Sequence, residues 1–287
     1  MILVTGATGN VGQELVRALA ERGEPVRAVA RSPAGASMPA AVDVAAADLA
    51  APETVGPALA GIRKVFLLGG FASPGLLQVV RDAGAERVVL LTSRCVVGGR
   101  PDNAITSMWL DAEAVVRDAE IPWTILRPSG FHSNALRWLP QLQQGDVVRA
   151  PWPDVPIASI DPADIAAVAA AVLTGTGHEG AAYALSGPEA LTPGRQVAAL
   201  AGVLGRPLRF EPLSDDEARA QMQADTPAPF IDAFFRFFTD GEYDDSVVVG
   251  SVKAITGKQP RTFERWAGEH AREFAGTAVR PSDRDRA

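Results

Sequence analysis

The chain has 287 residues, of which 47% are hydrophobic, and a formal net charge of -7, so it can bury a substantial core and gives no electrostatic reason to bind nucleic acid or membrane. Its apolar runs, such as IAAVAAAVL, are far shorter than the roughly 20 residues that span a bilayer. The single Cys95 excludes an intrachain disulfide framework, and the three histidines have no metal-ligand spacing. No basic segment precedes an apolar one at the N-terminus, and we expect a soluble cytoplasmic protein, monomer or homodimer, without a metal.

The first half of the sequence alternates short β-branched runs with segments of helical periodicity. We expect strands at 1–6, 25–31, 41–49, 64–70, 87–93 and 123–128, and helices at 11–23, 51–61, 73–85 and 105–119. Strands that alternate with helices indicate a parallel sheet covered by helices on both faces. The predicted fold class is therefore α/β, a Rossmann-type doubly wound parallel sheet with a smaller lobe.

That smaller lobe is expected after Pro128, where the regular alternation ends. A strand and a helix return in IASIDPADIAAVAAAVL, where Asp161 and Asp164 are interpreted as turn and N-cap residues. We predict an NADP-binding domain made of 1–130 and about 154–187, and a mostly helical substrate-binding lobe made of 131–153 and about 188–278. The tail 279–287 is expected to be disordered.

The segment VTGATGNVG places three glycines between the first strand and the first helix. Glycine there permits a tight turn, close approach of the backbone to a pyrophosphate and close packing of helix on strand. The helix N-terminus then offers unpaired N–H groups and a positive dipole to the phosphates. The segment thus predicts a dinucleotide site that includes Gly6, Thr8, Gly9, Asn10, Val11 and Gly12.

The end of the second strand indicates which dinucleotide binds. An acidic residue about 20 positions after the loop would hold the ribose hydroxyls of NAD. Arg31 and Ser32 stand there instead, and the next carboxylate is Asp43. A guanidinium suits a 2′-phosphate through paired charge-assisted hydrogen bonds, so the predicted cofactor is NADPH. The alternative interpretation of Arg31 is a solvated surface residue.

Five segments (TGATGNVG, VARSP, ADL, IPWTILRPSGF and LSGPEALT) resemble the NmrA-like branch of the atypical short-chain dehydrogenases/reductases, and the resemblance covers nearly the whole chain. It implies that Asp48 and Leu49 lie by the adenine, and that Leu68, Gly69 and Gly70 line the cofactor. It places Thr92 and Ser93 beside the nicotinamide. It brings Pro128, Ser129, Gly130 and Phe131 to the nicotinamide ribose and carboxamide.

Active members of the wider superfamily use a serine, a tyrosine that protonates the substrate carbonyl, and a lysine that lowers the pKa of the tyrosine. Ser93 matches the serine. The tyrosine and lysine positions fall on Ile105 and Trp109, which cannot exchange a proton, and no tyrosine or lysine occurs from residue 65 to 182.

Three functions remain open for a chain without this pair. The favoured one is NADPH-dependent reduction of a quinone or a polycyclic aromatic ketone of polyketide type, with the proton taken from a substrate hydroxyl or from water. The family contains quinone reductases and a ketoreductase of antibiotic biosynthesis that also lacks the pair. The second is a non-catalytic NADP(H) sensor of the NmrA type. The third is a reductase of ethers or phenylpropanoids, which typically depends on the missing lysine.

Ser93 and His132 are the candidate catalytic residues. Ser93 could orient the carbonyl or merely cap a loop, and His132, at the expected mouth of the site, could donate to an oxyanion or have no role. The aromatic stripe in PFIDAFFRFF is either core packing or a wall over a flat substrate. Candidate substrate-binding residues are Trp109, Phe131, His132, Asn134, Trp138, Phe230 and Phe234.

Overall fold

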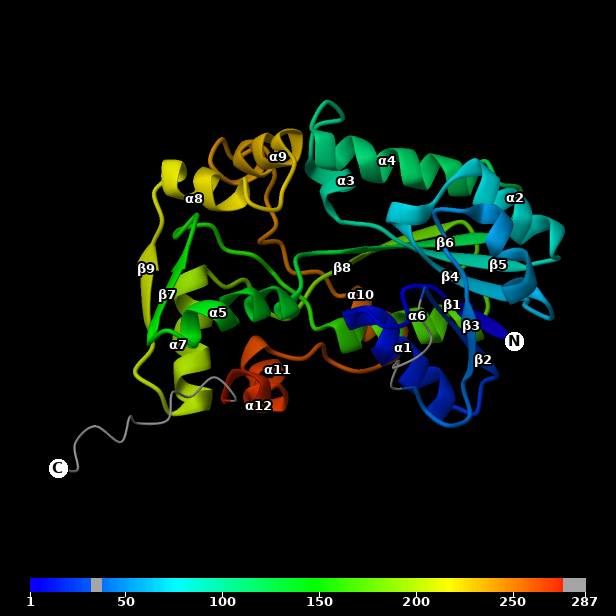
Figure 1. The fold of residues 1–287 in the computed structure, drawn as a ribbon, viewed down its shortest axis with the longest axis horizontal. Coiled ribbons are helices and arrows are strands. Elements are labelled where there is room, and N and C mark those ends of the chain that lie inside the picture. Colours follow the sequence, from blue (N-terminus) through cyan, green and yellow to red (C-terminus); the bar gives the residue numbers. More distant parts are fainter. Residues whose placement is uncertain (32–37, 276–287) are drawn as a thin grey trace.

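A seven-stranded parallel sheet forms the centre of the protein in the computed structural model, which describes residues 1–31 and 38–275. In spatial order the strands are β3 (Asp43–Ala46), β2 (Val26–Ala30), β1 (Ile2–Val4), β4 (Lys64–Leu68), β5 (Arg87–Leu91), β6 (Trp123–Pro128) and β8 (Ala181–Leu185). All neighbouring pairs are parallel. The strand order reverses between β1 and β4, which confirms the predicted doubly wound sheet (Figure 1).

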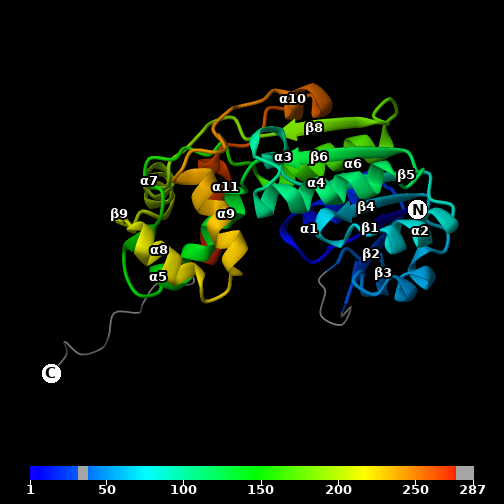
Figure 2. The same ribbon diagram turned by 90° about the horizontal axis from the view of Figure 1, so that it is seen from above.

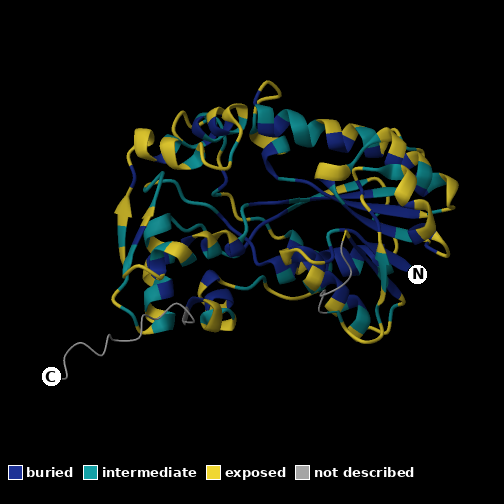
Figure 3. Cartoon of the chain, in the orientation of Figure 1, coloured by how far each residue is buried: buried dark blue, intermediate teal, exposed yellow. Residues whose placement is uncertain are grey.

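Helices cover both faces of the sheet, as the alternation of elements predicted. On one face lie α1 (Asn10–Glu21), α6 (Pro162–Thr174) and α10 (Ser251–Thr256); on the other lie α2 (Pro74–Asp82) and α4 (Ala104–Arg117). Each face has its own buried cluster, with Leu15 and Phe66 in one and Leu77 and Val116 in the other. Buried residues accordingly concentrate in the sheet and the inner sides of these helices (Figure 3).

One predicted helix is wrong in type. Residues 51–61 form two short 3-10 turns, η1 (Pro52–Thr54) and η2 (Gly56–Leu59), instead of one α-helix. The physical reason is the pair Gly56 and Pro57 in mid-segment, because proline has no N–H to donate and glycine disfavours an ordered helix.

The second lobe lies beyond the carboxyl ends of the strands (Figure 2). It contains η4 (His132–Trp138), α5 (Leu139–Leu142), β7 (Val147–Ala150), α7 (Pro193–Leu204), β9 (Arg209–Pro212), α8 (Asp215–Met222), α9 (Ala228–Phe238), α11 (Phe263–Glu269) and α12 (Ala271–Ala275). Strands β7 and β9 pair in parallel, so the lobe has a small sheet of its own. Its core gathers apolar side chains from α5, α7 and α11 around Trp266.

One element of the expected second lobe packs on the first domain instead. Helix α10, which was assigned to the second lobe, packs on α6 and β8 and buries Val252 in the core of the first domain.

Asp161 is the N-cap of α6, as expected, since its side chain accepts from the Ala163 amide at 2.8 Å. Asp164 instead pairs with Arg261 of the second lobe at 2.6 Å. The predicted tail 279–287 lies outside the described residues.

No helix in the described ranges combines the length and the apolar character that crossing a membrane would need. Within the same ranges, no cluster of histidine, cysteine or acidic side chains could hold a metal ion.

Candidate functional site

The glycine loop has the geometry that a bound pyrophosphate requires. Gly6 has φ +61°, and a Cβ added there would lie 2.3 Å from Cδ1 of Leu68. A Cβ on Gly12 would lie 2.1 Å from the carbonyl oxygen of Gly6. A side chain at Gly6 would strain the backbone because its φ lies in the left-handed region, and a side chain at Gly12 would push the loop away from α1.

The N-terminus of α1 is free to receive an anion. Its N-cap is Gly9, so no side chain occupies the first N–H groups, and the first turn contains no acidic residue. Thr8, Gly9 and Asn10 are exposed. The side-chain amide of Asn10 donates to Oγ of Ser133 at 3.0 Å, which links the loop to η4. Unpaired N–H groups and the helix dipole together fit the phosphates of a dinucleotide.

The residues expected near the adenine lie at the ends of β2 and β3. Arg31 is exposed and has no hydrogen bond or ion pair with any described residue, so its guanidinium is available to a phosphate. Ser32 lies outside the described residues. Asp48 is exposed and accepts from the Ala50 amide at 3.0 Å, whereas the side chain of Leu49 is buried.

The ends of β4, β5 and β6 meet at one edge of the sheet. A Cβ on Gly69 would lie 2.8 Å from both the Leu91 carbonyl oxygen and the Trp109 ring, so this ring covers Gly69. Gly70 is exposed beside it. The Ser129 hydroxyl at the end of β6 is buried and has no hydrogen-bond partner among the described residues. An orphaned hydroxyl at this edge fits the expected ribose or carboxamide of the cofactor.

Thr92 and Ser93 follow β5 directly, and their hydroxyl groups have different hydrogen-bond partners. The Thr92 hydroxyl is buried and donates to Oε1 of Glu113 at 3.0 Å, so the side chain points away from the edge. The Ser93 hydroxyl accepts from the amide of Cys95, the first residue of α3 (Cys95–Gly98), at 3.3 Å. The Ser93 side chain also hydrogen-bonds to the Cys95 thiol. Ser93 is therefore engaged within this turn, and its hydroxyl has to rotate before it can donate to a ligand.

Glu113 is a buried charge that the sequence did not reveal. The carboxylate is fully buried on α4 and receives two hydrogen bonds from Arg127, at 2.8 and 2.6 Å, and one from Arg117 at 2.7 Å. Although burial alone would raise the pKa of Glu113, these arginines and Thr92 hold it below the usual range. The network ties α4 to β5 and β6 and so fixes the helix that bears Ile105 and Trp109.

Helix α4 presents an apolar surface to the second lobe. Ile105 is buried and Trp109 is half-buried, and both pack with α9 through Phe230, Phe234 and Phe237. Phe230 and Phe234 keep part of their surface exposed. The aromatic stripe thus joins the two lobes.

His132 and Trp138 do not stand at the mouth of the site, and this placement corrects the expectation. Both are buried, at 1% and 6% exposure. The His132 ring contacts Ser159 Oγ at 2.9 Å and lies edge-on to Phe263. Burial lowers the pKa of His132 from 6.5 to about 4, so its ring is neutral at neutral pH and holds no spare proton for an oxyanion. The 3-10 geometry of η4 turns every third residue inward, which the sequence alone did not show.

A segment of the second lobe crosses the carboxyl edge of the sheet, and we call Glu242–Val249 the strap. Asp245 pairs with Arg94 at 2.9 Å after β5 and accepts from the Gly130 amide at 3.0 Å after β6. The Val249 amide donates to Ser186 Oγ at 2.9 Å after β8. The strap is therefore bonded to the ends of three strands.

The strap also brings Tyr243, which lies far from Ser93 in the sequence, to this edge. Its hydroxyl donates to Asp245 at 2.7 Å and accepts from Arg94 at 3.2 Å. Burial and the charge of Asp245 raise the pKa of Tyr243 well above its ordinary value. The Tyr243 proton is thus directed to Asp245, and the raised pKa makes this tyrosine a weaker acid than an ordinary one.

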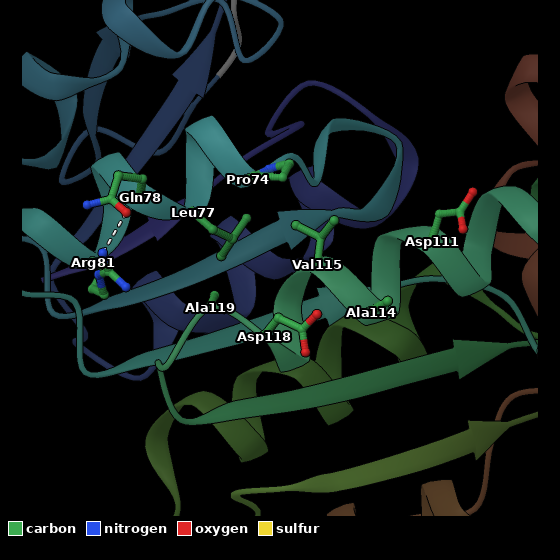
Figure 4. Close-up of a pocket in the computed structure, with 9 residues that line it drawn as sticks. All are labelled: Pro74, Leu77, Gln78, Arg81, Asp111, Ala114, Val115, Asp118 and Ala119. Atoms are coloured by element: carbon green, nitrogen blue, oxygen red, sulfur yellow. Dashed lines mark hydrogen bonds between the residues drawn. The ribbon is translucent and has the colours of Figure 1, made fainter.

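Two hollows on the outer face lie beside α4, away from the glycine loop. One, of about 390 Å³, lies between α2 and α4 and is lined by Leu77, Arg81, Asp111 and Val115 among others (Figure 4). The other, of about 430 Å³, reaches Gly69 and Gly70 from the α4 side. Gly69 and Gly70, two of the expected cofactor residues, thus line this second hollow.

Taken with the sheet order, the free N-terminus of α1 defines a dinucleotide-binding Rossmann protein. The NAD(P)H-binding family model matches residues 6–176. A (4-alkanoyl-5-oxo-2,5-dihydrofuran-3-yl)methyl phosphate reductase of Streptomyces griseus is 42% identical over 281 residues, which cover 96% of this chain and 99% of the relative. An NAD(P)H azoreductase of Xenophilus azovorans is 32% identical, with the same coverage of both chains.

Among solved structures, an NADPH-dependent quinone oxidoreductase of Escherichia coli superposes with a TM-score of 0.77 at 24% identity, over 94% of this chain and 99% of the other. That likeness supports the fold. The chain belongs to the NAD(P)H-binding family and is an NAD(P)H-dependent oxidoreductase.

Proposed function

We propose that the protein is an NADPH-dependent reductase of conjugated carbonyl acceptors, namely quinones or polycyclic aromatic ketones of polyketide type. The observation that carries the proposal is the apolar wall on α4. Ile105 and Trp109, which match the usual tyrosine and lysine by the sequence resemblance, belong to one apolar cluster with side chains of α9. A site without an acid on this helix suits acceptors whose reduced form needs no proton at the moment of reduction.

The relatives support this choice of acceptor. The name of the Streptomyces griseus protein describes a ring whose carbon–carbon double bond is conjugated with two carbonyl groups, and the Escherichia coli protein is named for quinones. In both kinds of acceptor the negative charge left by hydride addition is delocalised. Water or a substrate hydroxyl can then supply the proton, and positioning of the two reactants accounts for most of the rate.

The residues of the chain have distinct parts in such a reaction. When bound, NADPH supplies the hydride. The α1 N-terminus holds the phosphates, and Arg31 is placed to bind the 2′-phosphate. The Ser93 hydroxyl can donate to the acceptor oxygen, while Trp109 and Ile105 keep water from this side of the site.

The test compares NADPH oxidation with 1,4-naphthoquinone and with cyclohexanone. We expect turnover with the quinone and none with the isolated ketone, because the alkoxide formed from cyclohexanone has no delocalisation and meets no acid. Ser93→Ala should retain considerable activity, because the proton comes from the substrate or from water. A fall in activity of about 100- to 10,000-fold, the size of a full acid or base contribution, would contradict this expectation. Equal turnover of both acceptors would show that the site has a proton donor, and no turnover with any conjugated acceptor would refute the proposal.

A further inference from the structure

The outward face of η4 bears a polar pair, Asn134 and Arg137. Along this segment His132, Ala135 and Trp138 are buried, whereas Asn134 and Arg137 are exposed. This is the three-residue period of a 3-10 helix, in which residues i and i+3 eclipse each other. With a rise of about 2 Å per residue, Asn134 and Arg137 stand one above the other, about 6 Å apart.

This face begins beside the expected nicotinamide segment. The side-chain amide nitrogen of Asn134 lies 3.9 Å from the position a Cβ would take on Gly130. Gly130 is held in place by Asp245 of the strap. Moving along η4 from Asn134 to Arg137 therefore leads away from the reacting edge of the sheet and into the second lobe.

Arg137 is a cation without a partner. Its guanidinium forms no hydrogen bond and no ion pair with any residue in the described ranges, in contrast to Arg127 or Arg206, which bind carboxylates. The side chain is exposed; surrounding protein lowers the pKa of Arg137, and the charge of Asp225 acts in the opposite direction. Asp225 belongs to the turn between α8 and α9 and forms no ion pair with Arg137.

An exposed guanidinium with no carboxylate in contact, beside an exposed side-chain amide, can bind an anion through a bidentate, charge-assisted pair. We propose that Arg137, with Asn134 beside it, forms a subsite for an anionic group on the acceptor, a phosphate or a carboxylate. This inference rests on the proposed function and adds to it that the preferred acceptor carries a negative charge at the end remote from the nicotinamide.

The experiment uses two acceptors that differ in charge, 1,4-naphthoquinone and 1,4-naphthoquinone-2-sulfonate, with the full-length protein. In the Arg137→Met variant we expect KM for the sulfonate to rise about 10- to 100-fold, the value of a hydrogen-bonded charge, with KM for the neutral quinone and for NADPH unchanged. Arg137→Lys should restore part of the loss, since lysine keeps the charge but not the planar fork. Inorganic phosphate should compete with the sulfonate in the wild-type protein and not in Arg137→Met.

The matched control is Arg209→Met. Arg209 is also an exposed arginine of the second lobe whose side chain has no hydrogen bond or ion pair with a described residue, but it lies on β9. Its variant should leave both KM values unchanged.

The outcomes separate this inference from the proposed function. If the wild-type protein reduces neither quinone, the proposed function fails. If it reduces the neutral quinone but Arg137→Met changes both acceptors alike, the anion subsite is refuted while the proposed function stands. A rise in KM for NADPH instead would assign Arg137 to the cofactor and would also refute the subsite.

Discussion

The buried His132 should make the stability of the protein fall in mildly acidic solution. Its Nε2 lies 3.4 Å from the Arg261 carbonyl, which can only accept, so Nε2 bears the proton and Nδ1 accepts from Ser159. Protonation of Nδ1 would place a charge in these buried surroundings. Burial therefore lowers the pKa of His132 from 6.5 to about 4, although the Arg261 carbonyl acts in the opposite direction.

The direction in which pH changes the free energy of unfolding follows from proton uptake by the unfolded chain. Between pH 6.5 and 4 the unfolded chain binds a proton at His132 that the folded protein does not, so unfolding becomes easier as the pH falls. From pH 7 to pH 5 this linkage removes about 2 kcal/mol from the free energy of unfolding. The stabilisation is complete above pH 6.5 and is lost as the pH approaches 4.

The assay is urea unfolding at pH 7 and pH 5 for the wild-type protein and His132→Gln. Glutamine can donate to the carbonyl and accept from Ser159 but cannot titrate. We expect the wild-type protein to lose about 2 kcal/mol more than the variant over this interval. Asp161 and Asp164, whose pKa values burial raises, change stability in the opposite direction, but both proteins share them and their effect cancels. Equal losses in the two proteins would refute the reasoning.

Three further changes test other parts of the site. Asp245→Asn should lower the free energy of unfolding by about 3 kcal/mol, because it leaves the buried Arg94 without its counter-charge. The control Asp43→Asn, in which the carboxylate is exposed, should lower it by less than about 1 kcal/mol. Similar losses for the two variants in urea unfolding would contradict the role of burial. Arg31→Ala should lower kcat/KM for NADPH by about 10-fold or more and leave that for NADH unchanged, and a parallel fall for both would show that Arg31 does not read the 2′-phosphate. Gly12→Ala should abolish NADPH binding in fluorescence titration, since its Cβ would lie 2.1 Å from the Gly6 carbonyl oxygen. Tight NADPH binding by this variant would show that the glycine loop can move to accommodate the methyl group.

Local patterns in the sequence were enough to predict the first domain. The glycine loop, the β-branched runs and the helical periodicity each depend on residues near one another in the chain, and the sheet order agrees with them. Periodicity failed at 51–61, where Gly56 and Pro57 outweighed it. The segment that forms α10 was expected in the second lobe with the rest of 188–278, because nothing local indicates that Val252 packs in the core of the first domain.

The candidate site was less predictable, because several of its residues lie far apart in the sequence and come together only in the folded protein. Asp245, Tyr243 and Arg94 have no spacing that could have linked them, and the Glu113 network joins a helix to two strands. His132 was misplaced because a segment after a strand was taken as an exposed loop, when it is a 3-10 helix with one face inward. The period of three along 132–138 was the signal that could have found it.

The strap has a consequence for how the chain folds. Its hydrogen bonds to Ser186, Gly130 and Arg94 join residues 63, 115 and 149 positions apart. Closing loops of that length costs chain entropy before any contact repays it, and a sheet with only parallel neighbours offers no hairpin to start from. We therefore expect the strap to dock last, after β5, β6 and β8 are aligned, so that the carboxyl edge of the sheet is bridged only in chains whose fold is already complete.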